Sequence, residues 1–167
     1  MQKEYHFTRT WVVFKSTSYV KDKDGNKIAK ISGNFFTMTR KKFIQNMNGE
    51  NQYMVRNKFW HLIARSGFVF DKEGKMVAKL RKKVLALADH YDIATRFGDI
   101  TIRGNILGFD YHITLNGTEI GHVARKMLGK DEFVLTLEEG NDPYFYIALV
   151  VELDNIFNKV NDDRDQD

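Results

Sequence analysis

An internal repeat, each copy centred on a glycine, is the feature that most constrains the fold of this chain. Residues 19–31 (YVKDKDGNKIAKI) align without gaps on residues 68–80 (FVFDKEGKMVAKL), and residues 113–126 (ITLNGTEIGHVARK) keep the glycine and two aliphatic residues at the same offsets. Weaker copies lie between these three, and the stretch FVLTLEEGNDPY opens a sixth unit. The turn glycines of the six units are Gly25, Gly49, Gly74, Gly98, Gly117 and Gly140.

Each unit predicts a β-hairpin, because its arms are rich in Val, Ile, Thr, Tyr and Phe and a turn glycine adopts positive φ without a Cβ penalty. The only proline lies near the end of the chain, so nothing blocks strand pairing along the body. The expected total is about ten to twelve antiparallel strands, which favours closure into a barrel. Strand alternation puts Ala29 with Ile31 and Ala78 with Leu80 on one face, and this small-plus-aliphatic face is predicted to line the interior.

The second arm of the sixth unit predicts a helix. Asp142 can cap it and Pro143 can occupy its first position. No charged residue interrupts residues 144–151, and a helix that is apolar all round is normally buried. We therefore expect a helix at about 143–158 that fills the barrel, within a single domain of residues 1–160, followed by an acidic disordered tail at 161–167.

Composition indicates a soluble cytoplasmic protein. Apolar residues make up 43% of the chain and charged residues 29%, and no apolar run approaches the roughly 20 residues of a transmembrane helix. The start of the chain lacks the pattern of a secretory signal, and the absence of cysteine fits a reducing compartment. The formal net charge is +4, and the body is more basic than that because the tail holds four Asp and one Arg. A basic body can attract phosphate-bearing partners such as lipid headgroups.

The hairpins, together with the stretches LRKKVLALADHYDI, GNILGFDYHITLNGTEIGHVARK and IALVVELD, resemble the LURP-one-related family. That family belongs to the tubby C-terminal-like superfamily, which also includes the phospholipid scramblases. The resemblance covers most of the chain and is strongest over residues 67–154. It implies a twelve-stranded β-barrel around a hydrophobic C-terminal helix. For function it implies little, since tubby domains bind phosphoinositides and scramblases act at membranes, but no catalytic set or phosphoinositide motif matches positions of this chain.

The sequence contains none of the common motifs for nucleotide binding, hydrolysis or zinc binding. The glycine-rich nucleotide loops, the G-x-S-x-G motif and the H-E-x-x-H motif are absent. The segment DKDGNKIAKISG resembles a calcium loop, but Lys27 stands where that loop needs glycine and Gly33 where it needs glutamate, so a hairpin turn is the better interpretation. The five histidines show no ligand spacing. We expect no catalytic residue, no metal and no cofactor.

Clusters of basic residues are the remaining indication of a binding function. The candidate residues for binding an anion or a lipid headgroup are Arg81, Lys82, Lys83, Arg125 and Lys126. A third cluster, Arg40-Lys41-Lys42, has a similar place, and a closed barrel can gather such clusters on one rim. The competing interpretation is that these charges keep a β surface soluble and discourage edge pairing.

The resulting hypothesis is a non-enzymatic binding or regulatory module that recognises anionic membrane lipid or a protein partner and is cytoplasmic or peripheral at the membrane. The alternative is an enzyme of unknown reaction with a pocket at a barrel mouth, using a residue such as His61 or His90. Nucleic-acid binding ranks third, because the aromatic residues recur at repeat positions and therefore mark the core. The oligomeric state is left open by the sequence.

Overall fold

The computed structural model describes residues 1–8, 17–34, 41–57, 66–82, 89–105, 110–126 and 132–164 of the chain. The elements are β1 (Gln2–Thr8), β2 (Ser18–Lys21), β3 (Lys27–Asn34), β4 (Lys41–Gln45), β5 (Asn51–Asn57), β6 (Ser66–Asp71), β7 (Met76–Lys82), β8 (Asp89–Thr95), β9 (Gly98–Asn105), β10 (Asp110–Leu115), β11 (Thr118–Arg125), β12 (Glu132–Glu138) and the helix α1 (Pro143–Arg164).

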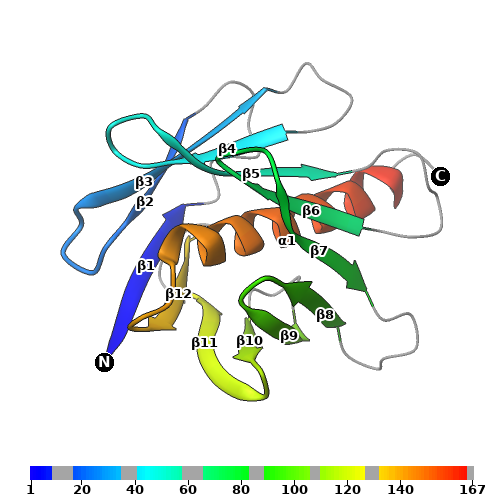
Figure 1. Cartoon of the computed structure of the whole chain (residues 1–167). Coiled ribbons are helices and arrows are strands. Elements are labelled where there is room, and N and C mark those ends of the chain that lie inside the picture. Colours follow the sequence, from blue (N-terminus) through cyan, green and yellow to red (C-terminus); the bar gives the residue numbers. More distant parts are fainter. Residues whose placement is uncertain are drawn as a thin grey trace.

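The strands form a closed antiparallel barrel. Each strand pairs with its neighbours in sequence, and β12 pairs with β1 to complete the ring. The closing pair runs without interruption from Gln2 opposite Glu138 to Thr8 opposite Glu132. Figure 1 shows α1 inside the ring, between β2–β6 above it and β8–β11 below it. The predicted barrel of about twelve strands around a C-terminal helix is confirmed.

The repeated acidic residue of the hairpins organises the turn. In the β2–β3 hairpin, Asp22 Oδ1 accepts hydrogen bonds from the backbone N–H groups of Asp24 and Asn26, both at 2.9 Å. Asn46 and Asp71 accept backbone N–H groups in the same way in the β4–β5 and β6–β7 hairpins. The glycines of these three turns have φ of 79° to 85°, a region that L side chains adopt only with strain. Asp or Asn and Gly therefore recur because the turn requires them.

The helix begins where the sequence predicts. Asp142 Oδ1 accepts the backbone N–H of Tyr144 at 3.0 Å, and Asp142 Oδ2 accepts the hydroxyl of Tyr53 on β5 at 2.6 Å, so the cap is fixed to the barrel wall. The helix continues to Arg164, past the expected end near 158 and into residues that we expected to be a disordered tail. In the part of the chain that the structure describes, no helix has the apolar length needed to cross a bilayer.

The core lies between the helix and the inner face of the barrel. Every helical residue from 145 to 156 is buried. Ala29, Ile31, Ala78 and Leu80 are each at most 2% exposed, which confirms the predicted inward face. The two alanines leave room for the helix side chains.

One glycine is required by close approach rather than by φ. Gly67 on β6 faces α1, and its backbone lies against the side chain of Glu152. A Cβ atom at position 67 would lie 2.5 Å from Cγ and 2.8 Å from Cδ of Glu152, distances that real carbon atoms do not adopt. Glu152 is fully buried, so its side chain has no solvent to move into.

We expect Gly67→Ala to destabilise the protein by about 1–3 kcal/mol, the usual cost of forcing an extra carbon into a packed interior. Urea unfolding of the variant and the wild type measures the loss. The double variant Gly67→Ala/Glu152→Ala removes the obstructing side chain and is the control. If the two substitutions are additive, the clash does not cause the loss.

Candidate anion-binding surface

The outer surface of β3–β7 carries basic side chains. Successive side chains of a strand point to opposite faces, and burial follows this alternation along β4. Asp71 is the one acidic residue in the five strands, and it faces inward, where Arg96 Nη1 lies 3.1 Å from its Oδ2. We define the basic wall as the described basic residues at outward positions away from the hairpin turns, namely Lys30, Lys41, Arg56, Lys79 and Arg81. Lys27, beside the turn at the start of β3, is also exposed.

An apolar row crosses the basic wall. Cross-strand pairing puts Phe43 on β4 opposite Met54 on β5, Met54 opposite Phe70 on β6, and Phe70 opposite Met76 on β7. Met76 is 50% exposed, although it is one of the large apolar residues of the chain. These four residues, the apolar row, place flexible and aromatic side chains between the cations of the wall.

Aromatic rings position two of the cations. The Arg56 guanidinium carbon lies 5.3 Å from the ring centre of Phe70, and Lys79 Nζ lies 5.5 Å from the ring centre of Phe68. Arg56, Phe68 and Lys79 are also direct cross-strand partners. Each contact is worth about 0.5–1 kcal/mol at an exposed site, so the stems are held along the sheet while the charges stay near solvent.

The structure describes the side chains of three of the predicted binding residues, Arg81, Arg125 and Lys126. Arg81 is exposed in the basic wall, and Lys82 ends β7, with its side chain outside the described part. Lys83 lies outside the described residues. Arg125 and Lys126 lie at the end of β11, where Lys126 Nζ is 3.8 Å from Glu132 Oε2. Arg81 and Arg125 both lie at the barrel end opposite the glycine turns.

The two predicted clusters lie on strands that are not neighbours in the barrel. Three strands lie between β7 and β11, which corresponds to roughly 20 Å along the barrel wall at ~4.8 Å per strand.

The third basic cluster is divided between the two faces of β4. Lys41 faces outward, whereas Lys42 is buried and faces the helix. The missed residues are Lys30, Arg56 and Lys79, and they come together only once the cross-strand register is known.

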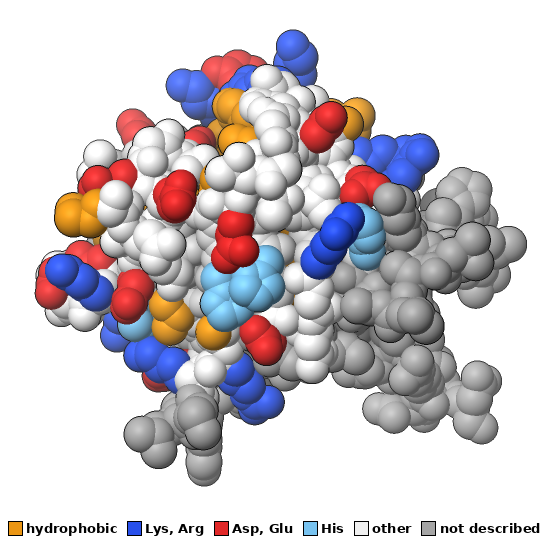
Figure 2. Space-filling model, turned by 90° about the horizontal axis from the view of Figure 1, so that it is seen from below, with side chains coloured by type: hydrophobic (Ala, Val, Ile, Leu, Met, Phe, Trp, Pro, Cys, Tyr) orange, Lys and Arg blue, Asp and Glu red, His pale blue; other side chains and the backbone are white. Residues whose placement is uncertain are grey.

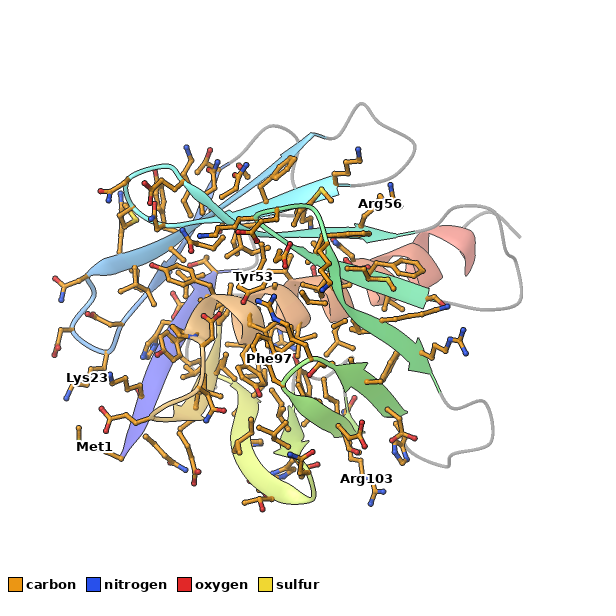
Figure 3. All side chains as sticks on the ribbon, in the orientation of Figure 1. Met1, Lys23, Tyr53, Arg56, Phe97 and Arg103 are labelled. Carbon is orange, nitrogen blue, oxygen red and sulfur yellow. The ribbon has the colours of Figure 1, made fainter. Side chains whose placement is uncertain are left out.

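The opposite side of the barrel has the reverse charge. The outward carboxylates of β8–β12 and β1, which we call the acidic wall, are Glu4, Asp92, Asp99, Asp110, Glu119, Glu132 and Glu138. Arg103 is the one lysine or arginine at a described outward position there, although Lys3 and Arg125 are exposed at the ends of β1 and β11. Figure 2 shows this side, with acidic side chains next to histidine side chains near its centre and lysine or arginine side chains mostly toward its edges. In Figure 3, Arg56 and Arg103 lie on opposite sides of the molecule.

The histidines of the acidic wall bind carboxylates. His112 and His122 are cross-strand partners whose rings stack with centres 4.4 Å apart. Nδ1 of His112 lies 3.0 Å from Glu119, and Nε2 of His122 lies 2.9 Å from Asp110. Among the described residues, no group of three or more histidine or acidic side chains is arranged to hold a metal ion.

Of the two histidines named for a possible enzyme, the structure describes His90, which lies on the acidic wall. His90 Nε2 lies 2.8 Å from Asp92 Oδ1, on an outer strand surface. His61 lies outside the described residues.

A buried carboxyl lies inside the barrel. Glu152 of α1 accepts a hydrogen bond from Asn155 Nδ2 at 3.1 Å. Burial raises the pKa of Glu152 to about 8, although Asn155, the ammonium of Lys42 and the backbone N–H of Phe68 all favour the ionised form. Glu152 is completely buried, so in this conformation it supports packing rather than contact with an outside ligand.

Comparisons with known proteins agree with the barrel. A family model described as LURP-one-related matches residues 4–154. The crystal structure of a protein from Arabidopsis thaliana is similar, with a TM-score of 0.69 and 17% sequence identity, over 93% of this chain and 91% of the plant chain. No curated protein matches the sequence.

Proposed function

Since the chain belongs to the LURP-one-related family, we propose that it is a non-enzymatic module that binds anionic lipid surfaces through its basic wall. The observation that carries the proposal is the wall itself: five cations with no outward carboxylate among the described residues of β3–β7. An anionic bilayer attracts each Lys or Arg near its surface by about 1 kcal/mol, so such a wall supports weak, salt-sensitive attachment.

The apolar row favours a lipid surface over a soluble anion. Phe43, Met54, Phe70 and Met76 lie among the cations, and a face that mixes both kinds of side chain fits the interface between headgroups and acyl chains. An acidic protein surface is the competing partner, because it satisfies the same cations.

Vesicle flotation tests the proposal. We expect wild-type protein to float with vesicles that contain phosphatidylserine or a phosphoinositide, to stay behind with pure phosphatidylcholine, and to be released when salt rises from ~0.1 M to ~0.5 M. Arg81→Glu should weaken binding roughly 30-fold, because the reversal changes two charge units at ~1 kcal/mol each.

Arg103→Glu is the matched control, since it makes the same change at an exposed arginine on the opposite wall. It should leave flotation close to that of the wild type. Equal recovery with charged and neutral vesicles would refute lipid binding, and equal losses in the two variants would refute the basic wall as the binding surface. The pair Lys82→Glu/Lys83→Glu tests the adjoining strand end separately.

A further inference from the structure

The two walls have opposite charge on opposite sides of one barrel. The basic wall presents five cations, and the acidic wall presents seven carboxylates against Arg103. The walls meet where Arg81 on β7 pairs with Asp92 on β8. We propose that the acidic wall is a docking surface for the basic wall of a second copy of this chain, so that copies associate head to tail and cover their own lipid-binding surface.

The carboxylates of the acidic wall are accessible for such a contact. The side chains of Asp110 and Glu119 are 70% and 58% exposed. Their described partners are histidines on neighbouring strands, not lysines or arginines. The described cation that pairs with a carboxylate of this wall, Lys126 with Glu132, lies at the strand ends, where both side chains remain more than 40% exposed.

Charge decides which pairs of walls can meet. Two basic walls repel each other, as do two acidic walls, so a two-fold symmetric contact of either wall with itself is disfavoured. An acidic wall against a basic wall is attractive and leaves one free wall of each kind at the two ends. Such a head-to-tail contact builds open chains rather than closed dimers.

Electrostatic matching sets orientation and association rate more than affinity, so the contact should be weak and should disappear as salt screens it. Self-association and lipid attachment use the same basic wall and therefore exclude each other. That competition rests on the proposed function, whereas the association itself rests only on the two walls.

Sedimentation velocity with charge-reversed variants tests the inference. The acidic-wall variant is Asp110→Lys/Glu119→Lys, and the basic-wall variant is Lys79→Glu/Arg81→Glu. Wild-type protein at low salt should show an average mass that rises about twofold as concentration increases from ~10 μM to ~1 mM, the range in which weak complexes form. In high salt it should remain monomeric.

Each variant alone should remain monomeric at low salt, because one wall has lost its complement. An equimolar mixture of the two should associate again, since the intact acidic wall of one faces the intact basic wall of the other. Thermal unfolding of each variant checks that these surface substitutions leave the fold intact. A mixture that stays monomeric overturns the inference.

Other outcomes are also decisive. Wild-type association that both variants retain would assign the contact to another surface and overturn the inference. Binding of a lysine-rich peptide by the acidic wall, without association of the chain itself, would assign the wall to a different basic partner. The acidic-wall variant should still float with anionic vesicles, so the experiments distinguish a failure of lipid binding from a failure of self-association.

Discussion

A chain that ends at Gly140 is expected to lose its cooperative tertiary structure, because it lacks the helix that fills the barrel. The large apolar side chains that the deletion removes from the core are Phe145, Tyr146, Ile147, Leu149, Val150, Val151, Leu153 and Ile156. Burial of one such side chain contributes about 1.5–3 kcal/mol, so the set contributes about 12–24 kcal/mol, which is comparable to or larger than the ~5–15 kcal/mol by which a domain is usually stable.

Near-ultraviolet circular dichroism, thermal unfolding and binding of a hydrophobic dye measure this effect. The shortened chain should show no sharp transition and should bind the dye through its open interior. A chain ending at Arg164 is the control and should unfold like the wild type, and a peptide of residues 141–164 supplied separately should restore part of the transition. A soluble 1–140 fragment that unfolds cooperatively would contradict the interior role of α1.

The second large effect concerns pH and Glu152. The pKa of this carboxyl in the folded protein is about 8 against a usual value of 4.5, so the folded state binds the proton more tightly than the unfolded state. The resulting stabilisation is fully present below about pH 4.5 and is lost as the pH rises through about 8. Glu152→Gln should therefore have the same free energy of unfolding as the wild type near pH 4.5. Near pH 8 its free energy of unfolding should be higher than that of the wild type by an amount on the order of several kcal/mol.

Urea unfolding of both proteins between these limits gives the difference as a function of pH. The groups that face Glu152 are Asn155 on the same helix, Lys42 on β4 and the Phe68 N–H on β6, and all three oppose the shift. Glu138→Gln, the same substitution at an exposed position of β12, is the control. A constant difference between Glu152→Gln and the wild type at every pH would show that this carboxyl does not titrate on unfolding.

The sequence was sufficient for the architecture because the signals are local and repeated. A turn glycine and the acidic residue three positions before it define each of the clearest hairpins, and a period of two along the arms identifies Ala29 and Ala78 as interior. The helix start was equally local, since Asp142 and Pro143 are adjacent in sequence. The helix end was not, because no residue near 158 stops the helix.

The candidate surface depends on contacts that a linear pattern does not contain. Arg56 and Lys79 become neighbours of Phe68 only through the register of β5, β6 and β7. In sequence, Lys42 belongs to a basic cluster that resembles a surface feature. In the structure it shares the inner face with Ile44, and the buried carboxyl near it, Glu152, lies far away in the sequence. The two predicted clusters looked equivalent in sequence, and strand order is what separates them.

The pairing of β1 with β12 has a consequence for synthesis of the chain. The first strand emerges from the ribosome more than a hundred residues before the strand that completes its ladder, an interval of roughly ten seconds at ~5–20 residues per second. Throughout that interval one edge of the nascent sheet and the apolar face meant for α1 are open to other chains. Contacts between distant parts of a sequence also slow folding. Protection of the growing chain is therefore as much a requirement of this closed barrel as its stability once α1 is in place.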